Sequence, residues 1–131
     1  MKILSFLLFL CINATSQMMA QNDAPFVYVE KMPQFPGGNE ALYQFLGTHI
    51  HYPDSCRSMG ISGNVIVQFV VDTTGYITNP KIVRGLSCGF NEEALRIISL
   101  MNDMNLRWSP GMHEGEKRSV AFMLPIKFAL K

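Results

Sequence analysis

The sequence predicts an α+β domain in which a three-stranded antiparallel sheet carries two helices packed on one face. In residues 119–130 every second residue, from Val120 to Leu130, is a large aliphatic or aromatic one, which is the pattern of a strand with one buried face. Residues 64–84 hold two strand-like runs joined by a turn sequence, and a helical pattern stands on either side of them. The order helix, hairpin, helix, strand gives this sheet when neighbouring strands pair antiparallel.

Residues 1–20 have the pattern of an export signal. Lys2 supplies a positive charge ahead of an apolar run over residues 3–12, and small residues follow as far as Ala20. The run is shorter than the roughly 20 residues that span a bilayer. We therefore expect cleavage after Ala20 and an exported chain, with an uncleaved signal anchor in the inner membrane as the alternative.

Composition limits what the exported chain does. It is long enough for one domain with a single core. The net charge is +1 and only 16% of residues are charged, so we expect no nucleic-acid partner. Loss of the signal leaves Cys56 and Cys88, and an even pair in an oxidising compartment favours a disulfide between them over two free thiols.

Residues 21–35 are expected to be an extended lead-in, with a short strand over residues 26–29, and residues 36–131 to be the domain. Gly37 and Gly38 break the chain, and Asn39 is expected to cap the first helix. The apolar side of this helix holds Leu42, Phe45 and Leu46.

The central hairpin begins with the alternating run of residues 64–71. Residues 72–75, Asp-Thr-Thr-Gly, have turn chemistry, and residues 76–84 return as the second arm. The apolar residues Ile77 and Ile82 differ in parity on either side of Pro80, which predicts a β-bulge there.

The second helix is expected to start at Asn91 as its cap, with Glu92 and Glu93 in the positive first turn. Its buried side is formed by Ala94, Ile97, Ile98 and Met101. A polar loop over residues 112–117 then leads to the last strand.

Pro125 lies within the last strand. Proline donates no hydrogen bond to a ladder and is confined to edge strands, strand starts and bulges. We therefore expect an edge strand with a bend or bulge at Pro125. An unpaired edge is a place where a partner's strand adds to the sheet.

No set of residues predicts catalysis or a metal site. The chain lacks a Gly-x-Ser-x-Gly nucleophile motif, and a disulfide would consume the Cys56 thiol. His49 and His51 form at most half of a metal site. We expect no enzyme activity, no metal and no cofactor.

An ordered set of motifs resembles the C-terminal domain of the energy transducer TonB, in the form common in Bacteroidetes-like bacteria. The resemblance covers residues 32–130. The motifs are Pro36-Gly-Gly38, Tyr52-Pro53, Gly60-Ile-x-Gly63-x-Val65, Gln68-Phe-Val-Val-Asp72 with Gly75, Val83-Arg-Gly85, Glu93-Ala-Leu-Arg96, Trp108-x-Pro-Gly111 and Leu124-Pro-Ile-x-Phe128.

The resemblance implies a periplasmic module that binds outer-membrane, TonB-dependent receptors and supports transport of siderophores, vitamins or glycans. In the family an extended receptor segment, the TonB box, adds beside the last strand. Residues ahead of Tyr-Pro, here His49 and His51, touch the receptor plug. On the last strand the expected contacts are Ser119, Val120, Ala121, Phe122, Met123, Leu124 and Lys127.

Two alternatives use the same domain. One is a self-associating structural or assembly protein that pairs two copies through the last strand, as a homodimer. The other is a membrane-anchored energy transducer. A full transducer in this family has a long Pro-rich spacer, whereas here only residues 21–35 separate the signal from the domain. Motor proteins of the inner membrane are therefore not the expected partners.

Overall fold

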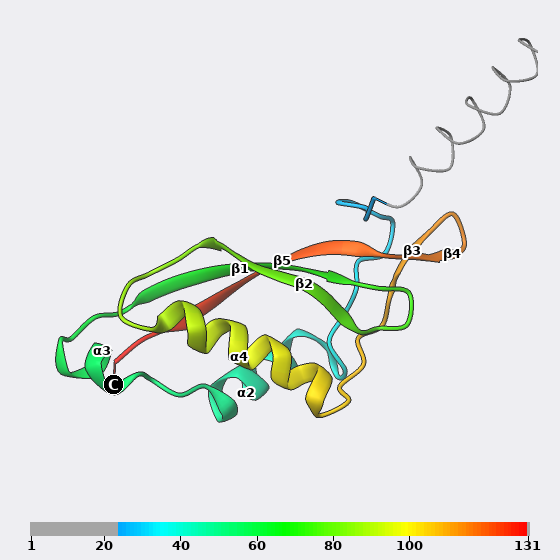
Figure 1. Cartoon of the computed structure of the whole chain (residues 1–131). Coiled ribbons are helices and arrows are strands. Elements are labelled where there is room, and N and C mark those ends of the chain that lie inside the picture. The colour runs from blue at the N-terminus through cyan, green and yellow to red at the C-terminus, as the bar shows by residue number, and fades with distance from the viewer. Residues whose placement is uncertain (1–23, 131) are drawn as a thin grey trace, which may run out of the picture.

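The computed structural model describes residues 24–130, so the predicted signal, residues 1–20, lies outside the described residues. A three-stranded sheet forms one layer of the domain, and Figure 1 shows α2 and α4 below it. In chain order the elements are α2 (Gly38–His49), α3 (Asp54–Ser58), β1 (Gly63–Val71), β2 (Ile77–Arg84), α4 (Phe90–Asp103), β3 (Gly111–His113), β4 (Glu116–Arg118) and β5 (Val120–Phe128).

The predicted antiparallel sheet is confirmed, with strand order β2-β1-β5. β1 is central because it pairs on one side with β2 and on the other with β5. β5 is therefore an edge strand, as Pro125 predicted. Its ladder with β1 runs without interruption from the pair Val71 and Val120 to the pair Gly63 and Phe128.

Of the bend or bulge predicted at Pro125, the bulge is wrong. Pro125 lies opposite Ile66 in a regular register with no shift along β5. Alternate residues of a strand direct their N–H and C=O groups to opposite sides. Because Ala121 directs its N–H away from β1, Pro125, four residues on, faces the same way. No hydrogen bond to β1 is lost, and the strand needs no bulge.

The bulge predicted near Pro80 is confirmed. Gln68 lies opposite Lys81 and Val70 opposite Thr78, so β2 has an extra residue within this interval. Asn79, inside it, has a φ of 51°, a left-handed conformation that asparagine tolerates better than most residues.

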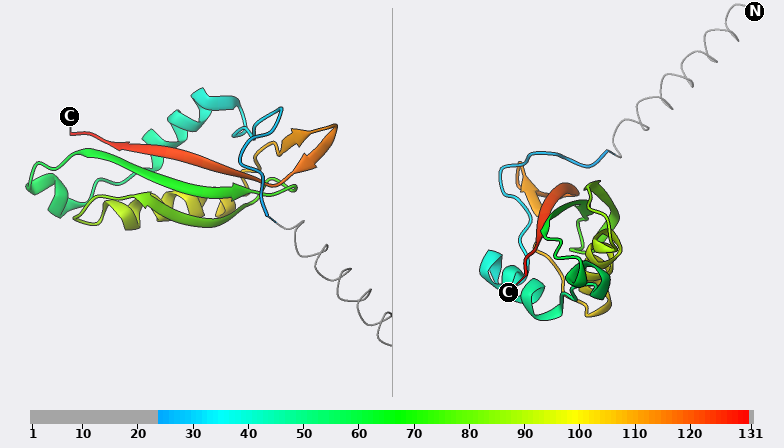
Figure 2. Two further views of the ribbon diagram at one scale, coloured as in Figure 1. Left: turned by 90° about the horizontal axis from the view of Figure 1, so that it is seen from above. Right: turned by 90° about the vertical axis from the view of Figure 1, so that its left-hand side faces the viewer.

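The core lies between the sheet and the helices. α4 packs against β1 and β2, whereas Figure 2 shows α2 next to β5, on the side away from β1. That α2 packs on the same face of the sheet as α4 stays a prediction. Buried residues of one hydrophobic cluster include Leu42, Phe45, Leu46, Val65, Val67, Phe69, Val71, Ala94, Ile97, Ile98, Met101, Trp108, Leu124, Ile126 and Phe128.

Neither Asn39 nor Asn91 is the N-cap of its helix, so both predicted helix caps are wrong. α2 starts after Gly37 and α4 after Gly89, each glycine with a positive φ and no side-chain cap bond. Asn39 lies within the first turn of α2. The Asn91 side chain instead accepts the Leu86 N–H at 3.0 Å, so it holds the loop ahead of α4.

Two short elements were not predicted. α3 follows Pro53, and β3 and β4 form a small hairpin within the segment expected to be a polar loop. Glu114 and Gly115, which join these two strands, both have positive φ, the conformation that tight hairpin turns need. Within residues 24–130, no helix has the length and hydrophobicity needed to cross a membrane.

Gly75 connects the central hairpin to the core. The turn is held by the Asp72 carboxylate, which accepts the N–H groups of Thr74 and Tyr76. The Gly75 carbonyl accepts the Trp108 N–H at 3.0 Å. A Cβ at Gly75 would lie 2.3 Å from the Trp108 carbonyl oxygen, so only glycine fits this approach of two backbones.

We expect Gly75→Ala to lower the free energy of unfolding by more than about 2 kcal/mol, because it adds a backbone clash to a φ of 89°. Gly115→Ala is the matched control. Gly115 also has a positive φ, but its Cβ would meet nothing within 4 Å. That variant should lose only about 1 kcal/mol. Equal losses in urea denaturation would contradict the role given to the Trp108 contact.

Candidate partner-binding site

The side of β5 that faces away from β1, here called the β5 edge, carries backbone groups that no other strand of the sheet uses. Its direction is fixed by Ala121, whose N–H donates to Phe26 on this side. By alternation Met123, Pro125 and Lys127 also direct their backbone groups to the β5 edge. Pro125 has no N–H, so Met123 and Lys127 supply the donors for an added strand.

The side chains of β5 divide between the core and the surface. Val120 and Leu124 are buried, and Phe122 packs against Trp108 with ring centroids 5.2 Å apart. Met123 is 51% exposed, and Lys127 is exposed. Of the predicted contact residues on this strand, Met123 and Lys127 therefore offer a side chain as well as backbone, while Val120 and Leu124 serve the core.

A groove lies between the β5 edge and α2. Its volume is about 210 Å³, and it is lined by Tyr43, Leu46, Gly47, Ile50, Pro125, Ile126 and Lys127. Gly47 leaves room on the helix side because it has no side chain, and Tyr43 is 62% exposed at the groove. Side chains of an added strand that point toward α2 would therefore meet a mostly apolar surface.

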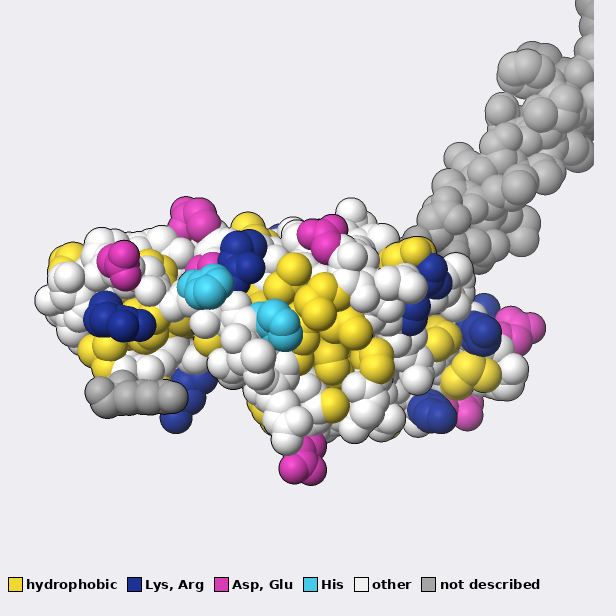
Figure 3. All heavy atoms as spheres, turned by 90° about the horizontal axis from the view of Figure 1, so that it is seen from below, with side chains coloured by type: hydrophobic (Ala, Val, Ile, Leu, Met, Phe, Trp, Pro, Cys, Tyr) yellow, Lys and Arg dark blue, Asp and Glu magenta, His cyan; other side chains and the backbone are white. Residues whose placement is uncertain are grey.

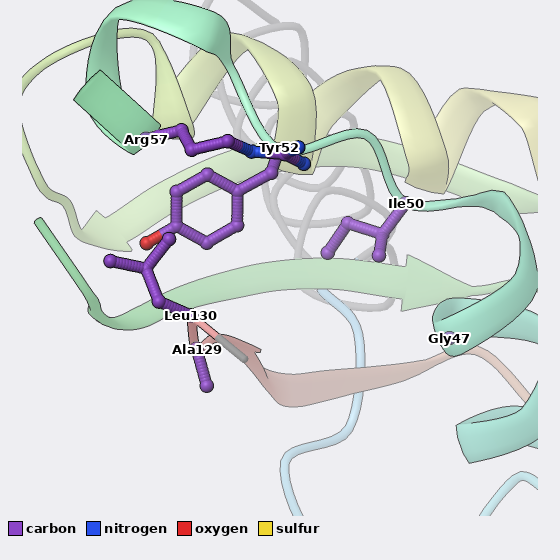
Figure 4. A pocket seen from close by; sticks show the side chains of 6 residues that line it. All are labelled: Gly47, Ile50, Tyr52, Arg57, Ala129 and Leu130. Atoms are coloured by element: carbon purple, nitrogen blue, oxygen red, sulfur yellow. The ribbon is translucent and has the colours of Figure 1, made fainter. Parts of the chain in front are cut away.

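A second hollow of about 410 Å³ continues the groove toward the C-terminal end of β5. Figure 4 shows Tyr52 and Leu130 facing each other there, with Ile50 pointing in and Arg57 above the tyrosine ring. Figure 3, from the side of the helices, shows hydrophobic side chains gathered in a patch beside histidines. The site thus combines the backbone groups of the β5 edge with a mostly apolar groove beside them.

Residues 49–51, the last residue of α2 and the two that follow it, are held in place by α4. Arg96 Nη2 donates to the His49 carbonyl at 2.7 Å, and the His51 N–H donates to Glu93 Oε2 at 2.5 Å. Arg96 and Glu93 also form an ion pair, with Nε and Oε1 2.7 Å apart. His51 remains exposed, so this network presents its imidazole to solvent from a fixed backbone.

Glu93 is the only buried charged side chain among residues 24–130. Burial by itself would raise the pKa of its carboxyl, but the Arg96 guanidinium and the His51 N–H outweigh it and lower that pKa below its ordinary value. The predicted position of Glu93 in the first turn of α4 is confirmed, whereas this network was not predicted. The Glu93 and Arg96 spacing is the one signal for it in the sequence.

We expect Glu93→Gln to destabilise the fold by about 1–2 kcal/mol at neutral pH, since it removes the charge that faces Arg96 and His51. A folded pKa below the unfolded value means that this contribution is present above about pH 4.3 and is lost as the pH falls through the folded pKa. The difference between the two proteins should therefore shrink in acid, as measured by urea denaturation across pH.

Glu92→Gln is the matched control, because Glu92 shares the first turn of α4 but is exposed. It should change stability by less than about 0.5 kcal/mol. A loss for Glu93→Gln that stays constant down to acid pH would contradict the network.

His49 and His51 do not form a metal site with other residues. No group of three or more His, Cys, Asp or Glu side chains suitable for a metal occurs within residues 24–130. His49 Nδ1 lies 3.0 Å from the Phe45 carbonyl, and its ring stacks on that of Phe45 at 4.4 Å. His49 is thus held against α2 by contacts with Phe45.

The two cysteines predicted to pair are neighbours, but the structure has both as free thiols. Cys56 Sγ donates to the Cys88 carbonyl at 2.5 Å, and Cys88 Sγ lies 3.4 Å from Ser55 Oγ. The sulfurs are thus directed at other groups. Burial raises the pKa of the Cys56 thiol to about 11. Cys88 has a φ of 78°, which is unfavourable for a residue with a Cβ. The disulfide remains a prediction.

Cys88→Gly tests it. In reductant the variant should be more stable than the wild type by about 1 kcal/mol, because glycine relieves the left-handed conformation. After oxidation the wild type should be the more stable by about 3 kcal/mol, since a bridge would close a loop of about thirty residues. Urea denaturation with and without reductant measures both, and peptide mass mapping identifies the bond. The same order in both conditions would argue against the disulfide.

Most of the candidate site lies in a part of the chain that matches a known family. Residues 48–130 match the family model described as "Gram-negative bacterial TonB protein C-terminal". No curated protein and no solved structure matches the chain. The match includes all three strands of the sheet, α4 and the segment from His49 to Tyr52, so it spans most of the residues that form the candidate site.

Proposed function

Because the chain belongs to the family of Gram-negative bacterial TonB C-terminal domains, we propose that it binds the TonB box of outer-membrane receptors by strand addition on the β5 edge. Domains of this family are periplasmic and act in energy transduction and protein interaction. The proposed role is binding without catalysis, in support of the transport of siderophores, vitamins or glycans.

The observation that carries the proposal is the open edge itself. β5 is paired by β1 on one side only, and Met123 and Lys127 direct their N–H groups away from β1. Main-chain hydrogen bonds of this kind give affinity for any extended segment, whereas side-chain pockets give specificity. The groove between α2 and β5 supplies such a pocket beside the edge.

Residues 49–51 support a second contact with the same receptor. Glu93 and Arg96 bind the backbone of this segment from α4, so its side chains are presented without the entropy loss that an ordering loop would add. His51 is exposed and is the residue of this segment best placed to touch a partner outside the groove.

The proposal predicts the effect of Lys127→Pro. Lys127 occupies the same phase of β5 as Pro125, which the strand already accommodates, so the fold should persist. One of two donors on the β5 edge is lost, and we expect a roughly tenfold weaker affinity for a TonB-box peptide. Lys127→Ala, which keeps the N–H, is the matched control and should weaken binding by less than about threefold.

Backbone NMR titration with TonB-box peptides from the same organism measures both variants and maps the site. Shifts along Met123 to Lys127 and at His49 to His51 are the expected result. Absence of shifts at millimolar peptide, together with a concentration-dependent change from monomer to dimer, would refute receptor binding and favour self-association through the same edge.

A further inference from the structure

Phe26, in the lead-in (residues 21–35), lies against the start of the β5 edge. The Phe26 N–H donates to the Ser119 carbonyl at 2.8 Å, and the Ala121 N–H donates to the Phe26 carbonyl at 2.7 Å. These bonds make a parallel bridge between Phe26 and Val120. The chain therefore places one of its own residues on the edge that a partner strand would use.

Side chains hold Phe26 in this position. Its ring lies 5.5 Å from that of His113, and the Arg118 guanidinium lies 5.4 Å from its centroid, within the range of a cation–π interaction. Both neighbours belong to the β3–β4 hairpin. This hairpin thus serves as a platform for the lead-in next to β5.

The rest of the lead-in is anchored at three further points. Lys31 and Met112 exchange two backbone hydrogen bonds, of 3.0 and 2.9 Å, and Gln34 and Ser109 exchange another two, of 3.1 and 2.8 Å. Val29 is only 1% exposed. It packs so closely against Gly111 that a Cβ added to this glycine would lie 3.2 Å from the Val29 side chain. The bridge at Phe26 is therefore the outermost contact of a firmly attached segment.

The lead-in leaves the edge directly after Phe26. The bridge at Phe26 is isolated, and neither Val27 nor Tyr28 forms a backbone hydrogen bond with β5. Their side chains are 79% and 81% exposed. A parallel strand that did continue would place Tyr28 between Ala121 and Met123. The groups on the edge from the Ala121 carbonyl to Lys127 thus remain available, while the Ala121 N–H and the Ser119 carbonyl are occupied.

We propose that the lead-in around Phe26 is an intramolecular cap on the β5 edge, which limits strand addition to the stretch from Met123 to Lys127. An added strand can start where the lead-in departs but cannot extend to Ser119 without displacing Phe26. The same cap disfavours full-length pairing of β5 with β5 of a second copy. The cap itself depends only on the bridge between Phe26 and Val120, whereas its effect on a receptor segment rests on the proposed function.

Amide hydrogen exchange by NMR tests the cap without any partner. The Ala121 amide should exchange at least tenfold more slowly than those of Met123 and Lys127, although all three face the same edge. Phe26→Pro removes the N–H that binds Ser119 and should bring the Ala121 rate close to that of Met123. Tyr28→Ala, in the same segment but exposed, should leave all three rates unchanged. Phe26→Gly, which keeps both backbone bonds, separates the contribution of the ring.

The effect of the cap on peptide binding and on dimerisation is measured separately. In Phe26→Pro, shifts caused by a TonB-box peptide should extend to Ser119 and Ala121, and sedimentation should show more dimer than in the wild type. Equal exchange of Ala121 and Met123 in the wild type would overturn the cap. Slow exchange of Ala121 without any peptide binding would instead leave the cap in place and refute the proposed function.

Discussion

The pairing of β5 with β1 is the interaction on which the rest of the molecule depends. The ladder covers the whole of both strands in one register, and burial of Val120, Leu124, Ile126 and Phe128 fixes its phase. In a strand the same parity decides which side chains are buried and which backbone groups bond to the neighbour. The residues of β5 that bury their side chains therefore also bond to β1. The backbone groups of Met123, Pro125 and Lys127 are left for the open side.

Around this ladder the molecule arranges two kinds of support. The lead-in and the β3–β4 hairpin lie at the start of β5, where they occupy the edge. α2 and residues 49–51 lie at its other end, and α4 holds that segment through Glu93 and Arg96. The edge is therefore occupied at the start of β5, whereas at the other end the groove beside α2 borders it.

Local patterns predicted the elements well where one periodicity dominates. β5, the hairpin with its turn at Gly75, and the apolar side of α4 each follow from side-chain alternation or helical spacing. The helix caps were wrong because glycines with positive φ start both helices, and such starts need no side chain. The bulge at Pro125 was wrong because the requirement for an N–H depends on which side of the strand is paired.

The sequence by itself determined that the last strand is an edge with a buried face, since both properties follow from alternation and from the missing N–H of Pro125. Only the tertiary structure decided what borders that edge. The bridge from Phe26 to Val120, the contact of Glu93 with His51 and the groove beside α2 join residues far apart in the chain. Such contacts leave no periodic trace, because their geometry arises only when the packed elements meet.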